Sequence, residues 1–128
     1  MIAVMTTWRA VRDFEGIYEV SDQGQVRSLG RVVKGRDGSD RYINGKVISQ
    51  RERPDGTKIV NLWRSNNYRQ LPVRRLVLEA FDQPRPRGYD AINTNGDSSD
   101  NRLQNLQWQI DRRSRAALRH AVGSCDAK

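Results

Sequence analysis

Apolar and polar residues alternate over short stretches in the first half of the chain, which is typical of strands rather than helices. A β-prone run at residues 17–20 and a second run at residues 26–29 flank a turn sequence at residues 22–24. Residues 46–53 and 57–64 flank a Pro-Asp-Gly turn in the same way. The pattern therefore predicts two antiparallel hairpins, with Gly at the positive-φ position of the second turn.

Side-chain alternation also assigns faces within the second hairpin. Val60 and Leu62 fall on one face, while Ile59 and Trp63 fall on the other. Residues 30–45 separate the two hairpins and are rich in Gly, Asp and Arg, so they predict an exposed loop between strands.

The apolar spacing changes to that of a helix after Pro72. One apolar face is formed by Leu76, Val77, Ala80 and Phe81. This predicts a helix that packs on the core. A second helix is predicted for residues 111–121, with Asp111 as a plausible N-cap and Gly123 as a plausible stop.

Between these helices, residues 91–110 predict a strand, a tight polar loop and a second strand. The Asn-Gly-Asp sequence at residues 95–97 is a strong turn signal, because Asn and Gly tolerate positive φ. Asn101 and Asn105 flank Leu103 and precede an apolar run, so buried amides are expected to tie the loop to a small core. The predicted fold class is α+β, with short antiparallel strands and a helix followed by a strand-strand-helix unit.

At 128 residues the chain predicts one compact domain, residues 1–128. We divide it into a β-rich module at residues 8–72, a strand-strand-helix unit at residues 73–122 and a flexible tail at residues 123–128. There is no apolar run long enough to cross a bilayer and no pattern of a signal peptide at the start, so a cytoplasmic location and no membrane partner are expected. The lone Cys125 is expected to be a free thiol in the tail.

The chain carries 23 Lys and Arg against 15 Asp and Glu, a net charge of +8. Such a surface attracts polyanions, and nucleic acid is the leading partner, although a basic composition can also serve solubility alone. On the second predicted helix, Arg112, Arg115 and Arg119 form a basic stripe with Arg113 beside it. The residues expected to contact DNA are Arg27, Arg31, Lys34, Arg36, Arg74, Arg112, Arg113, Arg115 and Arg119. A solvated face remains the alternative for the helical stripe and for the loop.

Two stretches resemble a known family. The N-terminal stretch contains a Trp, then Glu-Gly-x-Tyr-x-Val-Ser, then Gly-x-Val-Arg-Ser-Leu, from Trp8 to Leu29. It resembles the nuclease-associated modular motif that often precedes phage HNH domains. The stretch from Ala91 to Trp108 resembles the ββα-metal (HNH-like, His-Me finger) motif of phage-type HNH homing endonucleases, matching at Gly96 and at the Asn-Arg and Asn-Leu-x-Trp elements.

The resemblance assigns roles by position. In the gap-free register Asn93 stands where the family keeps the general-base His, Ile92 where it keeps a metal-binding Asp or Asn, and Ser114 where it keeps the last ligand. Asn105 alone of the family's H-N-H trio is retained, as a structural residue. A register shifted by one residue puts Asn93 on the ligand position and Thr94 on the histidine, and still supplies no base. Arg74 replaces a second His of the family pattern.

Few other residues offer replacement chemistry. His120, the only histidine, lies well off the helix face that carries Ser114, because successive residues rotate by about 100°. Asp90, Asp97 and Asp111 are carboxylates that suit a divalent ion, although Asp97 and Asp111 already have roles as turn and cap residues. We expect no catalytic residues and no metal ligands.

Three hypotheses follow. The first is a DNA-binding protein of HNH homing-endonuclease descent that has lost catalysis and, by analogy, regulates a phage or prophage. It requires no cofactor. The second is a residual nicking endonuclease with substituted ligands for Mg²⁺ or Mn²⁺. The third is a module that binds a host or phage protein of the nucleic-acid machinery.

Overall fold

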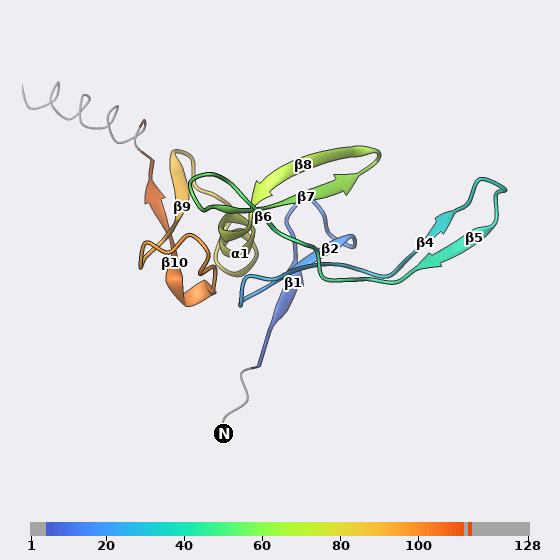
Figure 1. Cartoon of the computed structure of the whole chain (residues 1–128), viewed down its shortest axis with the longest axis horizontal. Coiled ribbons are helices and arrows are strands. Elements are labelled where there is room, and N and C mark those ends of the chain that lie inside the picture. Colours follow the sequence, from blue (N-terminus) through green and yellow to red (C-terminus); the bar gives the residue numbers. More distant parts are fainter. Residues whose placement is uncertain (1–4, 112, 114–128) are drawn as a thin grey trace, which may run out of the picture.

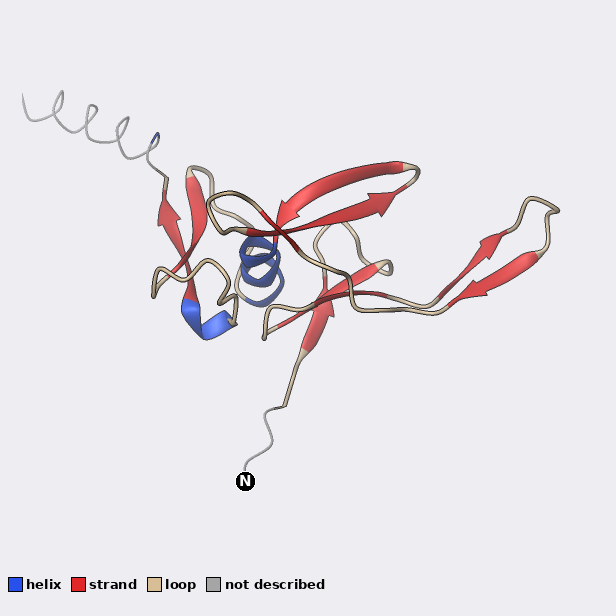
Figure 2. Ribbon diagram, in the orientation of Figure 1, coloured by secondary structure: helices blue, strands red, loops and turns tan. Residues whose placement is uncertain are grey.

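The computed structural model describes residues 5–111 and 113, and has the predicted α+β class. Short antiparallel strands surround one helix, which lies at the centre of the molecule (Figure 1). Figure 2 shows how much of the described chain is strand or loop. No helix in the described residues is long and apolar enough to span a bilayer.

The N-terminal sheet has the order β1-β2-β3, with β1 at Trp8–Ala10, β2 at Tyr18–Ser21 and β3 at Val26–Ser28. The predicted hairpin is therefore confirmed as β2 and β3. The β1 strand was not predicted, because only its pairing with β2 and not an apolar alternation defines it.

The second sheet has the order β6-β7-β8, with β6 at Arg51–Glu52, β7 at Lys58–Arg64 and β8 at Asn67–Pro72. The predicted turn is confirmed, with Gly56 at φ +89°. Its first strand is shorter than expected, because residues 46–48 hydrogen-bond to β3 instead. The β8 strand was not predicted, since four of its residues are exposed and polar or aromatic without alternation.

Residues 30–45 form a hairpin and not the predicted loop. Its strands are β4 at Arg31–Lys34 and β5 at Asp40–Ile43, and it extends away from the rest of the molecule (Figure 1). Val32 and Tyr42 are paired across it and remain 62% and 67% exposed. The loop prediction was wrong because neither face of this hairpin is buried, so the sequence lacks the apolar alternation that marks a strand.

The predicted first helix is confirmed as α1, Val73–Phe81, whose buried residues include Leu76, Val77 and also Leu78. It packs against the second sheet, the N-terminal sheet and the ribbon formed by β9 at Tyr89–Asn93 and β10 at Leu106–Ile110. The short 3-10 helix η1, Leu103–Asn105, precedes β10. One core cluster joins Val20 and Val26 of the N-terminal sheet, Leu62 of the second sheet and Leu106 of the ribbon. The predicted strand-loop-strand at residues 91–110 is thus confirmed, whereas the predicted helix at residues 111–121 lies almost wholly outside the described residues.

Candidate functional site

The loop between β9 and β10 is held in place by the buried side chain of Asn105, as predicted from the sequence. Asn105 is 6% exposed. Its Nδ2 donates to the carbonyl oxygen of Asp100 at 2.9 Å and to Oδ1 of Asn95 at 3.0 Å. Its Oδ1 accepts from the Thr94 hydroxyl at 2.8 Å and from the Asn95 N–H at 3.2 Å. One amide therefore fixes both ends of the loop to the start of β10.

The side chain of Asn93, at the end of β9, also makes several hydrogen bonds. Its Nδ2 donates to the carbonyl oxygen of Asp100 at 2.8 Å and to Oδ1 of Asn101 at 2.9 Å. Its Oδ1 accepts from Nη1 of Arg74 at 3.1 Å. Both polar ends of the Asn93 amide are therefore used within the protein, and Arg74, which comes from α1, is one of the partners.

The carboxylates of this loop have local partners. Hydrogen bonds from the Ser99 side chain and N–H lower the pKa of Asp97, whose Oδ1 accepts both. Hydrogen bonds from Arg102, at 2.8 and 2.9 Å, lower the pKa of Asp100 to about 2. Both groups are thus ionised at neutral pH and shape the loop, which confirms the turn role predicted for Asp97.

The first half of the chain holds this loop from two sides. Gly24, at φ +87°, leaves room for Asn101, because a Cβ on Gly24 would lie 2.9 Å from the Asn101 Cβ. The N–H of Leu103 donates to the carbonyl oxygen of Asp22 at 2.8 Å. On the other side the turn before β7 approaches Ser98, whose Cβ would lie 3.5 Å from a Cβ on Gly56. The loop position therefore depends on both N-terminal turns.

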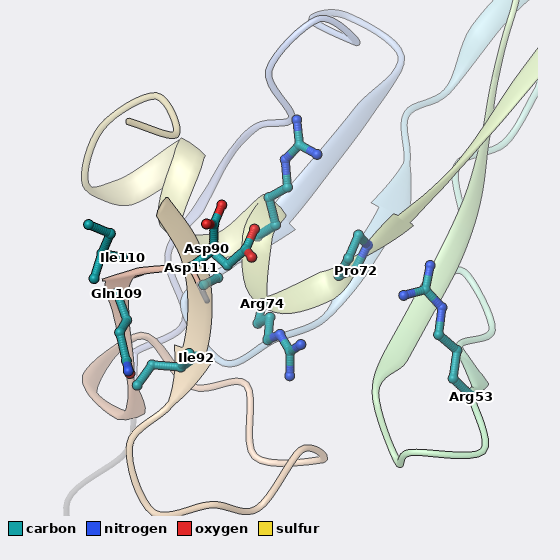
Figure 3. Close-up of a pocket in the computed structure, with 10 residues that line it drawn as sticks. Arg53, Pro72, Arg74, Asp90, Ile92, Gln109, Ile110 and Asp111 are labelled. Atoms are coloured by element: carbon teal, nitrogen blue, oxygen red, sulfur yellow. The ribbon is translucent and has the colours of Figure 1, made fainter. Parts of the chain in front are cut away.

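Beside the β9–β10 ribbon and the start of α1 lies a pocket of about 530 Å³. In Figure 3, Arg74 lies between the ribbon residues Ile92 and Gln109 on one side and Arg53 on the other. Asp90 and Asp111 are on the ribbon side. The pocket is thus lined by guanidinium groups from two distant parts of the chain and by two carboxylates.

The guanidinium groups of the pocket differ in the hydrogen bonds and ion pairs that they make within the protein. Arg75 pairs with Glu79 at 2.8 Å. Arg74 gives one N–H to Asn93. No side-chain hydrogen bond or ion pair involves Arg53 within residues 5–111 and 113. The first turn of α1 has Pro72 as its N-cap and no side-chain cap, so its backbone N–H groups add to the positive potential.

The predicted DNA-contacting residues fall in separate places. Arg74 is in the pocket. Arg31, Lys34 and Arg36 lie on the β4–β5 hairpin, where Lys34 pairs with Asp40 at 2.6 Å. Arg113 is exposed, and the predicted Arg112, Arg115 and Arg119 lie outside the described residues, as do Ser114 and His120.

The side chain of Arg27 contacts the other two strands of the N-terminal sheet. Its guanidinium pairs with Glu19 at 2.6 Å and stacks over the Trp8 ring, 4.0 Å from the centroid. These contacts hold β3 to β2 and to β1. Arg53 also lines the pocket that contains Arg74, which could not be predicted from the sequence because only the folded chain brings the turn before β7 to the start of α1.

The residues at the predicted ligand and base positions do not fit a divalent ion. Ile92 has an apolar side chain, and Asn93 is committed to three protein partners. Within the part of the chain that the structure describes, no three His, Cys, Asp or Glu side chains gather as a metal site.

Comparisons with known proteins agree with the resemblance seen in the sequence. The NUMOD4 motif matches residues 7–63. The DNA endonuclease I-HmuI of Bacillus phage SP01 is 25% identical over 101 residues, which is 79% of this chain and 51% of that protein. The solved structure described as DNA binding and cleavage by the HNH homing endonuclease I-HmuI matches with a TM-score of 0.66 at 22% identity, covering 91% of this chain and 59% of that chain.

These matches define the class as the HNH endonuclease scaffold with an N-terminal NUMOD4 motif. The chain is similar in sequence and in fold to an HNH homing endonuclease of a phage. It spans about half the length of the relative that it matches.

Proposed function

We propose that this protein binds double-stranded DNA on the scaffold of an HNH homing endonuclease and does not hydrolyse it. The observation that carries the proposal is the state of Asn93. The side chain at the position of the general base is an amide, and it is held by Arg74, Asp100 and Asn101.

The chemistry of phosphodiester hydrolysis explains why this matters. A water molecule must lose a proton as it attacks phosphorus, and a positioned base contributes roughly 10²- to 10⁴-fold to such a step. A carboxamide is not a useful proton acceptor near neutral pH. The neighbouring Ile92 offers no oxygen to a cation, which removes the usual means of stabilising charge on the phosphate.

Binding of the phosphate is a separate property, and the pocket retains it. Arg53 and Arg74 offer planar donor groups that suit phosphate oxygens. The uncapped N-terminus of α1 adds backbone donors and a favourable dipole. A DNA backbone passing over the ribbon would thus meet positive charge at the position where an active enzyme has its catalytic groups.

The partner follows from the relatives. The structure of I-HmuI is described as one of DNA binding and cleavage, which supports DNA as the ligand of this chain. The net charge of +8 agrees with a polyanionic partner. A protein that binds but does not cleave DNA suits a regulatory role in a phage or prophage, exercised in the cytoplasm of the host.

The proposal predicts salt-sensitive duplex binding that depends on the pocket. We expect log affinity to fall linearly with log salt concentration. Each substitution that removes one contact with a phosphate should make that slope shallower by about one unit. Arg53→Ala and Arg74→Ala should each weaken binding, and the double variant should weaken it further. The measurement is a fluorescence-anisotropy titration of a labelled duplex at several salt concentrations.

A matched control removes the same charge elsewhere. Arg9 lies at the other end of α1, where it stacks on Phe81 and donates to the carbonyl oxygen of Ala80. Arg9→Ala should therefore leave most of the affinity and the slope. Equal losses for Arg9→Ala and for the pocket variants would contradict a localised phosphate site, and an affinity independent of salt would contradict DNA binding through the backbone.

A further inference from the structure

We propose that the outer face of the β6–β7–β8 sheet binds an unpaired segment of DNA, with a base stacked on Trp63 and Tyr68. The inference rests on the proposed DNA binding, and it adds a second ligand form and a second surface. The outer face is the one that points away from the core and carries Ile59, Asn61 and Trp63 of β7 together with Tyr68, Gln70 and Pro72 of β8.

The two aromatic residues form a platform on the surface. Trp63 and Tyr68 are directly opposite each other in the register, with ring centroids 4.9 Å apart and planes inclined by 41°. They are 50% and 57% exposed. Rings of this size usually contribute most when buried, so two of them side by side at the surface leave a large apolar area open to a ligand.

The platform is held firmly by its backbone. The N–H of Trp63 donates to the hydroxyl of Tyr18, a buried residue of the core cluster, at 3.1 Å. A tight turn follows at Ser65 and Asn66, both with positive φ, and leads directly to β8. The hairpin projects beyond α1, so its turn end is accessible (Figure 1). Little ordering of the backbone of this hairpin is then required when a ligand binds.

Beyond the aromatic pair, this face carries two amide side chains, a buried isoleucine and an exposed arginine. Asn61 and Gln70 are paired across the strands, next to the aromatic pair along the sheet. Ile59 lies on the same face but is only 5% exposed, so the open part of the face does not extend over it. Arg51 is exposed and pairs with Ile59 in the register. At 3.3 to 3.4 Å per residue, Arg51 lies about 13 Å along the sheet from Trp63.

This combination of groups fits single-stranded DNA. The faces of bases in a duplex are covered by their neighbours, whereas an unpaired base offers both faces to an aromatic ring. The exposed Gln70 amide beyond the rings can hydrogen-bond to base edges, and Arg51 supplies charge for the backbone. The β8 strand runs directly into α1, whose first turn carries Arg74 of the phosphate pocket. An apolar protein partner would leave these basic groups without counterparts.

The test titrates the full chain with three probes of equal length. These are an oligothymidine single strand, the same strand with abasic sites in place of its bases, and a duplex. We expect the oligothymidine to bind and to quench tryptophan emission, and the abasic strand, which carries the same phosphates, to bind more weakly. Trp63→Ala and Tyr68→Ala should each lower affinity for the oligothymidine by roughly 5- to 100-fold. Trp63→Phe retains an aromatic ring, so its affinity for the oligothymidine should be close to that of the wild type, which would show that the site is intact.

The same probes separate this inference from the proposed function. The expected result is that Trp63→Ala leaves duplex affinity within about twofold while reducing affinity for the oligothymidine by the larger factor expected for stacking. Duplex binding without oligothymidine binding would overturn the stacking site and leave the proposed function standing. Equal affinity for the oligothymidine and the abasic strand would also overturn it, since the bases would then contribute nothing. Binding of neither the single strand nor the duplex would overturn both proposals.

Discussion

Gly24→Ala is expected to lower the free energy of unfolding by about 2 to 5 kcal/mol, through one strained backbone residue and one overpacked contact. Gly24 has φ +87°, which an L side chain rarely adopts. A Cβ there would lie 2.9 Å from the Cβ of Asn101 and 3.0 Å from its carbonyl oxygen. The second neighbour is backbone, so the contact cannot be relieved by a change of rotamer. Chemical denaturation followed by circular dichroism measures the effect.

Gly16→Ala is the matched control. Gly16 also has positive φ, at +80°, but a Cβ there would have no neighbour within 4 Å. It should therefore incur the backbone strain alone, about 1 kcal/mol or somewhat more. Equal destabilisation by the two substitutions would contradict the close approach between the N-terminal turn and the β9–β10 loop. The difference between them measures how strongly the NUMOD4 part of the chain supports that loop.

Asn105→Ala is the second large effect, with an expected loss of about 1 to 3 kcal/mol of unfolding free energy. The substitution removes four hydrogen bonds and leaves the carbonyl oxygen of Asp100 and the N–H of Asn95 without this partner. Asn95 and Thr94 are exposed and can turn to water, which limits the loss. The midpoint of urea denaturation reports the change.

Asn67→Ala provides the comparison for Asn105. Asn67 is exposed at the start of β8 and makes no side-chain hydrogen bond within the described residues. Its replacement should change the unfolding free energy by no more than about 0.5 kcal/mol. An unchanged midpoint for Asn105→Ala, equal to that for Asn67→Ala, would mean that the Asn105 amide does not hold the loop.

How far the sequence could predict this site depended on whether the contacts were local. The turn chemistry of Asn95, Gly96 and Asp97 and the amide of Asn105 act within about ten residues of chain, and those expectations were confirmed. The helix α1 was also predictable, because its apolar spacing faces a single core.

The contacts that the sequence did not reveal connect distant segments. Arg53 and Arg74 are far apart in the chain and line one pocket only because the turn before β7 folds back beside α1. The sequence indicated that Asn93 had replaced a histidine, but not that Arg74 would bond to it, nor that Asp100 and Asn101 would satisfy its other end. The β4–β5 hairpin was missed for the opposite reason, since it buries neither face.

The connection between Arg74 and Asn93 has a functional consequence. Where the resemblance places two histidines, this chain has a guanidinium and an amide joined at 3.1 Å. The pair keeps the end of β9 fixed and places positive charge beside the pocket. The amide of this pair cannot replace the histidine as a proton acceptor.

The positive control for loss of catalysis is the triple substitution Ile92→Asp, Asn93→His and Ser114→Asn. It returns oxygen ligands and an imidazole to the positions that the resemblance assigns to them. We expect this variant, if folded, to gain affinity for Mg²⁺ or Mn²⁺, measured by calorimetry, because hard cations prefer oxygen ligands. Metal affinity is the safer measurement, since activity also requires supporting contacts around the ligands.

The most direct test of the central claim is a plasmid assay that scores binding and nicking together. Supercoiled DNA is incubated with the wild-type protein in Mg²⁺ or Mn²⁺. Half of each sample is run on a native gel with the protein present, and the other half is run after the protein has been removed. We predict that the DNA is shifted on the native gel and remains supercoiled after the protein is removed. Metal-dependent conversion to the nicked form, abolished by a chelator and by Asp90→Ala or Asp97→Ala, would contradict the account and identify a nicking endonuclease with substituted ligands.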